Sequence, residues 1–159
     1  MSETPPPFQV FLDQNRDAVW RFLVSSVGPV DADDCFQETF ISALRAYPRL
    51  RAGSNTRAWV LTIAHRKAVD CHRGRARRAV PVAELEALDT RAPERPGAAD
   101  GELWGAVREL PPRQRSAVVL RFLGDLAHRE IAAAIGCSEE AARRSLHEGL
   151  QKLRTEVPA

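Results

Sequence analysis

The sequence lacks the features of several large classes of protein. Its three cysteines, Cys35, Cys71 and Cys137, are odd in number and widely spaced, which argues against a disulfide framework or a zinc ribbon and predicts buried, reduced thiols. No apolar run is long enough to cross a membrane, and the amino terminus (MSETPPPF) has neither the basic start nor the apolar stretch of a secretory signal. We therefore expect a cytoplasmic protein without membrane insertion, and we predict no metal and no cofactor.

The sequence also lacks the alternation of apolar and polar residues that marks a strand, and it has no visible repeat. With 44% hydrophobic and 28% charged residues, the chain has enough apolar side chains to form a core. Apolar residues recur at intervals of three and four, which predicts a helix over residues 8–26 and a second one capped by Asp31 and ended by Pro48. In the second helix Cys35, Phe40 and Leu44 follow this pattern. The predicted fold class is all-α.

The distribution of charge and of proline and glycine divides the chain into three segments. Residues 8–78 carry twelve Lys and Arg against seven Asp and Glu, whereas residues 79–101 carry two against five and hold three prolines. From residue 102 to the end there are nine basic and eight acidic residues. The pattern predicts two small helical domains, 8–78 and 102–157, joined by a flexible acidic linker over residues 79–101.

Residues 126–153 (LAHREIAAAIGCSEEAARRSLHEGLQKL) have the spacing of a helix-turn-helix. Ala132 is small where two helices cross, Gly136 suits the left-handed residue of a tight turn, and Ser138 suits the cap of the next helix. An ordinary helical hairpin is the alternative. The face of the second helix that points away from the core carries the residues that we expect to meet the major groove of DNA, namely Arg143, Arg144, His147 and Gln151.

A third long helix, predicted from residue 58, carries a basic stripe that suits DNA phosphates. The alternative is a solvated basic face in which Asp70 pairs with Arg66 or Arg73. The loop before this helix, beside Trp59, suits a pocket for an unstacked base, although Trp59 fits the core equally well. The stripe contains Arg66, Lys67, Asp70, Arg73 and Arg77, and the loop contributes Arg51, Ser54, Asn55 and Arg57.

Taken together, these segments resemble an extracytoplasmic-function sigma factor, a reduced member of the bacterial sigma family that keeps conserved regions two and four. The most specific segment is 31–40 (DADDCFQETF), which is similar to the acidic and aromatic signature of region two. Residues 58–70 (AWVLTIAHRKAVD) resemble the segment that reads and melts the minus 10 promoter element. Residues 109–123 (ELPPRQRSAVVLRFL) resemble the start of region four, and 126–153 its helix-turn-helix, which reads the minus 35 element.

The resemblance implies a function in transcription initiation without catalysis. Its implied partners are core RNA polymerase, promoter DNA and an anti-sigma factor or helper protein. By position, four residues would face the clamp of the largest polymerase subunit, while Cys35, Phe36 and Phe40 would pack inward. The four are Asp33, Asp34, Gln37 and Glu38. The acidic linker would run through the polymerase, or it would serve only as a connection.

The recognition helix departs from the family pattern after His147, where basic residues are common and this chain has Glu148 and Gly149. Fewer phosphate contacts and a flexible glycine predict weak binding of the minus 35 element. The alternative is that Glu148 points to solvent and has no effect.

Two other classes of function compete with a sigma factor. A conventional helix-turn-helix regulator would bind its DNA site without polymerase core. A hydrolase or metal enzyme would use His65, Cys71 and His72, but these lie on one helix and lack a fourth ligand or an oriented base.

Overall fold

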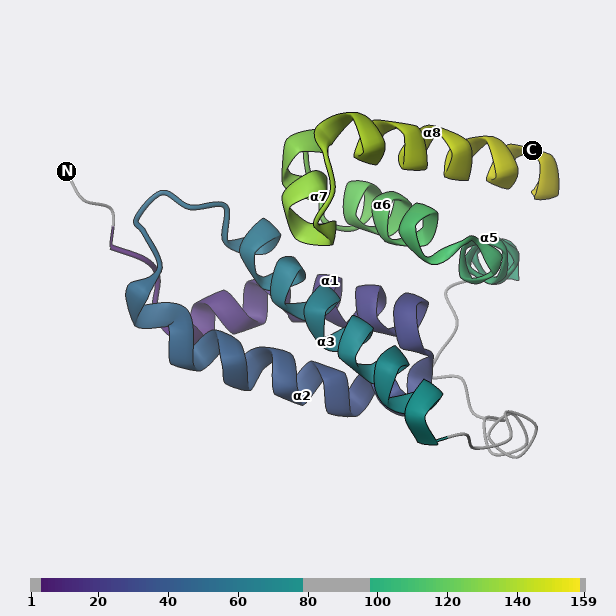
Figure 1. The fold of residues 1–159 in the computed structure, drawn as a ribbon. Helices are drawn as coiled ribbons and strands as arrows, with labels where there is room; N and C mark the ends of the chain where they lie inside the picture. The colour runs from purple at the N-terminus through teal and green to yellow at the C-terminus, as the bar shows by residue number, and fades with distance from the viewer. Residues whose placement is uncertain (1–3, 79–97, 158–159) are drawn as a thin grey trace.

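The structure, a computed structural model, describes residues 4–78 and 98–157. Within these ranges the chain forms helices joined by short turns and contains no strand. A bundle of three helices lies below a second group of four helices in Figure 1. The prediction of an all-α fold with two small domains is confirmed. Most of the expected acidic linker lies outside the described residues.

The first domain consists of α1 (Phe8–Val27), α2 (Pro29–Ala46) and α3 (Thr56–Arg78), which pack against one another in all three pairs. A 3-10 turn, Tyr47–Arg49, follows α2. Gly28 joins α1 to α2 with φ of 83°, a left-handed value that glycine adopts without steric cost. Helix α2 therefore begins with Pro29 at its first position, before the predicted cap. Asp31 lies in the first turn of α2, where it forms an ion pair with Arg75 of α3.

Aromatic side chains fill one end of this bundle. The ring of Trp59 lies 5.7 Å from that of Phe11 and 6.3 Å from that of Tyr47, measured between centroids. Trp59 is half-buried and packs against the core, which favours its assignment to the core. Leu44, in contrast, is 54% exposed, although it follows the apolar spacing that predicted the second helix. The buried stripe at the end of α2 runs through Thr39, Phe40 and Ala43, and Leu44 falls at its solvent side.

The second domain consists of α5 (Ala98–Glu109), α6 (Pro112–Phe122), α7 (His128–Ile135) and α8 (Glu139–Glu156). Helix α5 begins at Ala98, so the last four residues of the expected linker are helical. Gly136 has φ of 73°, and the hydroxyl of Ser138 accepts a hydrogen bond of 3.1 Å from the backbone N–H of Ala141. Ala132 is buried where α7 meets α8. These features confirm the predicted helix-turn-helix.

The two domains pack against each other, which the sequence pattern did not predict. Helix α3 lies along α7, and α1 contacts α5 and α6 (Figure 1). The fully buried side chains of Leu61 and Leu126 converge over Gly124. A Cβ atom at Gly124 would lie 2.6 Å from Cδ1 of Leu61 and 2.5 Å from Cδ1 of Leu126. Glycine at this position therefore permits the close approach of the domains.

Candidate nucleic-acid and protein interfaces

The acidic signature lies on the outer face of α2. The side chains of Cys35 and Phe40 are buried and that of Phe36 is half-buried, so the apolar members of the signature point into the bundle. Two turns of helix consequently present polar and acidic groups to solvent. The exposed residues are Asp33, Asp34, Gln37 and Glu38.

Two exposed apolar residues, Ile41 and Leu44, extend this face toward the end of α2. Ile41 is 49% exposed and Leu44 is 54% exposed. Both follow Gln37 at helical spacing, by four and seven residues, so they share its side of the helix. The sequence analysis did not include them in this face because it considered only the polar and acidic residues of the signature. Their spacing from Gln37 is the signal that could have identified them.

Burial makes Cys35 chemically inert. Burial, reinforced by the neighbouring Cys71 thiol, raises the pKa of Cys35 to about 12. The reactive form of cysteine is the thiolate, so this side chain remains a protonated thiol at neutral pH. All three cysteines are free, but of the thiols expected to be buried only Cys35 is, and Cys71 and Cys137 are half-buried.

Asn55, on the loop before α3, contacts both domains. Its Oδ1 accepts a hydrogen bond of 3.1 Å from the backbone N–H of Ala58, which caps the start of α3. Its Nδ2 donates a hydrogen bond of 2.8 Å to Oε2 of Glu130 on α7. Asn55 is nevertheless an exposed residue. The side chain expected to read a base therefore has both polar atoms engaged.

The other loop residues differ in how exposed their side chains are and in whether they bond to α1. Arg51 and Ser54 are exposed, and the Ser54 hydroxyl donates a hydrogen bond of 2.7 Å to the Arg51 carbonyl. Arg57 is half-buried and donates hydrogen bonds to Oδ1 of Asn15, at 3.4 Å, and to the carbonyl of Gln14, at 3.2 Å. Arg57 thus anchors the loop to α1.

The basic stripe on α3 is largely exposed. Arg66, Asp70 and Arg73 are exposed and Lys67 is half-buried, whereas the side chain of Arg77 lies outside the described residues. Asp70 forms no ion pair with Arg66 or Arg73, so the suggested internal pairing is absent from this part of the helix. Arg66, Lys67 and Arg73 can therefore contact an anionic partner on this face.

The outer face of α8 presents the four expected side chains. Arg143, Arg144, His147 and Gln151 are all exposed. Arg143 forms an ion pair of 2.9 Å with Glu139, one turn earlier. A surface pair of this kind contributes less than about 1 kcal/mol, so a phosphate competes with Glu139 at small cost.

Glu148 and Gly149 have structural roles that the sequence did not indicate. Gly149 is buried, and a Cβ atom there would lie 2.9 Å from Cγ2 of Val118 on α6. The glycine is thus explained by the close packing of α8 on α6 rather than by flexibility. The exposed Glu148 accepts a hydrogen bond of 3.2 Å from Nε2 of Gln114, also on α6.

His65, Cys71 and His72 do not form a metal-binding group. In the ranges 4–78 and 98–157, no three His, Cys, Asp or Glu side chains lie close enough together to hold an ion. Among the described helices, none combines the length and apolar character needed to span a bilayer.

Comparison with known proteins identifies the family. Residues 11–78 match the model of sigma-70 region 2, and residues 100–153 match that of sigma-70 region 4. The chain is 33% identical to the ECF RNA polymerase sigma factor SigD of Mycobacterium tuberculosis, over 93% of this chain and 76% of SigD. It is 32% identical to the ECF RNA polymerase sigma factor BldN of Streptomyces coelicolor, over 92% of this chain and 58% of BldN.

The fold is also that of a solved sigma factor. The sigma factor RpoE of Bartonella quintana, solved in complex with the anti-sigma factor NepR, superposes with a TM-score of 0.78. It is 23% identical to this chain, and the match covers 93% of this chain and 94% of RpoE. With both regions matched in order and a relative of this identity along most of its length, the chain belongs to the extracytoplasmic-function family of RNA polymerase sigma factors.

Proposed function

We propose that this sigma factor binds core RNA polymerase through the outer face of α2 and contacts promoter DNA through α3 and α8. The observation that carries the proposal is the composition of the α2 face. It joins four exposed polar or acidic residues to the exposed apolar residues Ile41 and Leu44. An exposed acidic surface with an apolar edge suits a basic protein partner, because opposite charge guides association and buried apolar area adds affinity.

The contacts with DNA divide by their chemistry. Arg66, Lys67 and Arg73 on α3 offer cations to the phosphates of the minus 10 region, and Arg51, Ser54 and Asn55 form the loop that receives a base. Arg57 has a positioning role, because its hydrogen bonds to α1 fix the loop. On α8, Arg143, Arg144, His147 and Gln151 face the minus 35 element.

The chain acts by binding and catalyses no reaction itself. Contacts with polymerase recruit it, and contacts with DNA fix the start site. It works in the cytoplasm, together with the polymerase, and needs no cofactor. Because the similar RpoE was solved with an anti-sigma factor, an anti-sigma factor is also proposed as a partner of this chain.

Reconstituted transcription with core polymerase tests the proposal. Asp34→Arg and Glu38→Arg abolish association with core enzyme and transcription, because they reverse charge at the exposed face. Thermal unfolding of both variants stays unchanged, since exposed substitutions shift stability by less than about 0.5 kcal/mol. Asp17→Arg, an exposed charge reversal on α1, is the matched control and keeps activity.

Two results would contradict the proposal. Full association of both α2 variants with core enzyme would remove α2 from the polymerase interface. Specific binding of a promoter duplex by the isolated chain, with no gain from core enzyme, would instead support a conventional regulator.

A further inference from the structure

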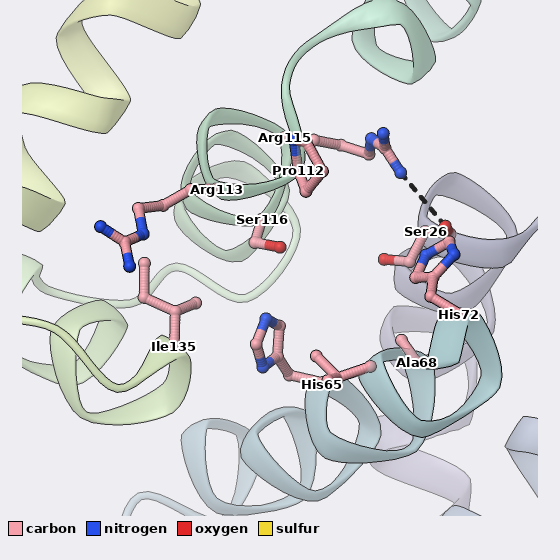
Figure 2. A pocket seen from close by; sticks show the side chains of 10 residues that line it. Ser26, His65, Ala68, His72, Pro112, Arg113, Arg115, Ser116 and Ile135 are labelled. Atoms are coloured by element: carbon pink, nitrogen blue, oxygen red, sulfur yellow. Dashed lines mark hydrogen bonds between the residues drawn. The ribbon is translucent and has the colours of Figure 1, made fainter. Parts of the chain in front are cut away.

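A cavity of about 170 Å³ lies between the two domains. Helix α3 contributes His65 and His72, and α6 contributes Arg113, Arg115 and Ser116. Figure 2 shows His65 pointing toward Ser116, while the side chains of Arg113 and Arg115 extend from α6 to opposite sides of the space, Arg115 toward Ser26. The lining contains no Asp or Glu. The cavity therefore gathers four groups that are cationic or can become so, without a carboxylate among them.

The guanidinium of Arg115 has only neutral partners. It donates hydrogen bonds of 3.2 Å to the carbonyls of Ser26 and Leu110, and its buried Nε has no hydrogen-bond partner. Burial lowers the pKa of Arg115, and the neighbouring Arg108 lowers it further. Glu109 is the carboxylate that acts against this, and its effect is smaller than that of Arg108. The charge of Arg115 is thus poorly compensated.

His65 is surrounded by the same excess of positive charge. Burial lowers its pKa, and the charges of Arg66 and His72 lower it further. The remaining neighbours do not offset them, because α6 adds Arg113 and Arg115, whereas α1 adds only Ser26 and α7 only Ile135 to the lining. An anion in the cavity would reverse this balance and favour protonated histidine.

The start of α6 adds to the positive potential. Helix α6 begins at Pro112, which lines the cavity, so its first turn lies at this site. Pro111 and Pro112 have no N–H and the N–H of Arg115 bonds to the carbonyl of Pro111, so the backbone donors at the positive end of this helix dipole are the N–H groups of Arg113 and Gln114. Two arginines, two histidines and a helix start together resemble the donor sets that bind phosphate in proteins.

We propose that this cavity binds a small, free oxyanion of the phosphate class, held by His65 and His72 from α3 and by Arg113 and Arg115 from α6. Because the ligand contacts both domains at once, it binds only when they are packed together. Its binding therefore stabilises the packed arrangement by mass action. The proposal does not depend on the sigma-factor interfaces, since the isolated chain is sufficient to test it.

Nuclear magnetic resonance of the histidine rings provides the test. The full chain is titrated with inorganic phosphate, and with chloride at equal ionic strength as the control. The ring signals of His65 and His72 shift saturably with phosphate only, and the pKa of His65 rises. His128 on α7, outside the lining, reports on changes elsewhere and stays unchanged.

Variants assign the binding to this cavity. Arg113→Gln weakens phosphate binding about tenfold, the effect of losing one charge-assisted hydrogen bond. Arg113 is exposed, so its replacement does not disturb the fold. Replacement of Arg115 would disturb it, because Arg115 is half-buried and bonds to the carbonyls of Ser26 and Leu110. Arg129→Gln, an exposed change on α7 outside the lining, is the matched control and leaves binding unchanged.

Three results would overturn the proposal. The first is the absence of a saturable shift at His65 and His72. The second is an equal loss of affinity in Arg113→Gln and Arg129→Gln, which would indicate general attraction of anions to a basic chain. The third is a shift caused by a short DNA duplex of arbitrary sequence but not by inorganic phosphate, which would assign the site to the DNA backbone.

Discussion

The side-chain amide of Asn55 donates a hydrogen bond of 2.8 Å to the carboxylate of Glu130. Each residue also caps its own helix, because Asn55 accepts from the N–H of Ala58 and Glu130 accepts from the N–H of Ala127, at 3.0 Å. One contact thus connects the start of α3 in the first domain to the start of α7 in the second. The residue proposed to receive a promoter base is held by the domain proposed to bind the minus 35 element.

Glu130→Ala should make the loop before α3 more accessible. A hydrogen bond of this kind contributes about 0.5–1.5 kcal/mol, so the isolated variant should bind a single-stranded minus 10 oligonucleotide about two- to tenfold more tightly. Fluorescence anisotropy with labelled oligonucleotide measures the change. Glu140→Ala, an exposed change on α8, should have no effect, and equal affinity of Glu130→Ala and wild type would show that the contact does not restrain the loop.

The basic stripe of α3 should act on all DNA sequences alike. Arg66→Ala and Arg73→Ala should weaken promoter opening by the holoenzyme for every minus 10 sequence. Each lost phosphate contact should also reduce the slope of log affinity against log salt by about 0.7–0.9. Asn55→Ala should instead alter the base preference with little change in this slope. Bubble formation at several salt concentrations measures both effects. A changed base preference in the arginine variants, or a reduced salt slope in Asn55→Ala, would contradict the proposed division of roles.

Glu148→Arg should strengthen use of the minus 35 element. The substitution removes a negative charge from the exposed face of α8 and adds a phosphate contact. The substitution also removes the oxygen that accepts a hydrogen bond from Gln114. Because this hydrogen bond is exposed to solvent, its loss costs less than about 1 kcal/mol of stability. Transcription from templates with and without the upstream element measures the effect. Strong dependence on that element in the wild type, without improvement in the variant, would show that Glu148 has no influence on promoter binding.

Gly149→Ala should destabilise the second domain, although alanine favours helices. The gain in helix propensity is about 1 kcal/mol. The new Cβ would lie 2.9 Å from Cγ2 of the buried Val118, and overpacking of this kind costs about 1–3 kcal/mol. Urea unfolding should therefore show a net loss of about 1 kcal/mol. Adding Val118→Ala should relieve the overlap, so that the double variant is more stable than the sum of the single effects; a more stable Gly149→Ala would disprove the packing explanation.

The lowered pKa of His65 predicts that stability depends on pH. Its ordinary value is 6.5, and the folded value is lower, so the unfolded chain binds more protons between the two values. The stabilisation is fully present above 6.5 and is lost as the pH falls from there toward the folded pKa. Urea unfolding in buffers without phosphate should show this loss, and His65→Gln should remove it. His147→Gln, at an exposed position, should leave the dependence unchanged.

Local patterns in the sequence predicted the elements well. Gly136 and Ser138 define the turn of the helix-turn-helix by local backbone chemistry, and both occupy the predicted positions. The start of α2 was misplaced because Asp31 was taken as a cap, although Gly28 and Pro29 also provide a helix start. Such errors arise where two local signals compete.

Contacts between distant segments could not be predicted in the same way. The pairing of Asn55 with Glu130 joins residues 75 positions apart, and no periodicity connects them. Gly149 was read as a flexible residue because its neighbour Val118 lies on another helix. Leu44 satisfied the apolar pattern of α2 but is 54% exposed. Helical spacing identifies a face, but the tertiary arrangement decides what covers that face.

The meeting of Leu61 and Leu126 over Gly124 has a consequence for the life of the protein in the cell. Both side chains are fully buried between the domains, so any separation of α3 from the second domain places two leucines in water. Exposed leucines attract other unfolded or partly open chains, which makes an open and unbound sigma factor prone to aggregation and to degradation. We therefore expect separation of α3 from the second domain to be favourable only where a partner covers these two leucines.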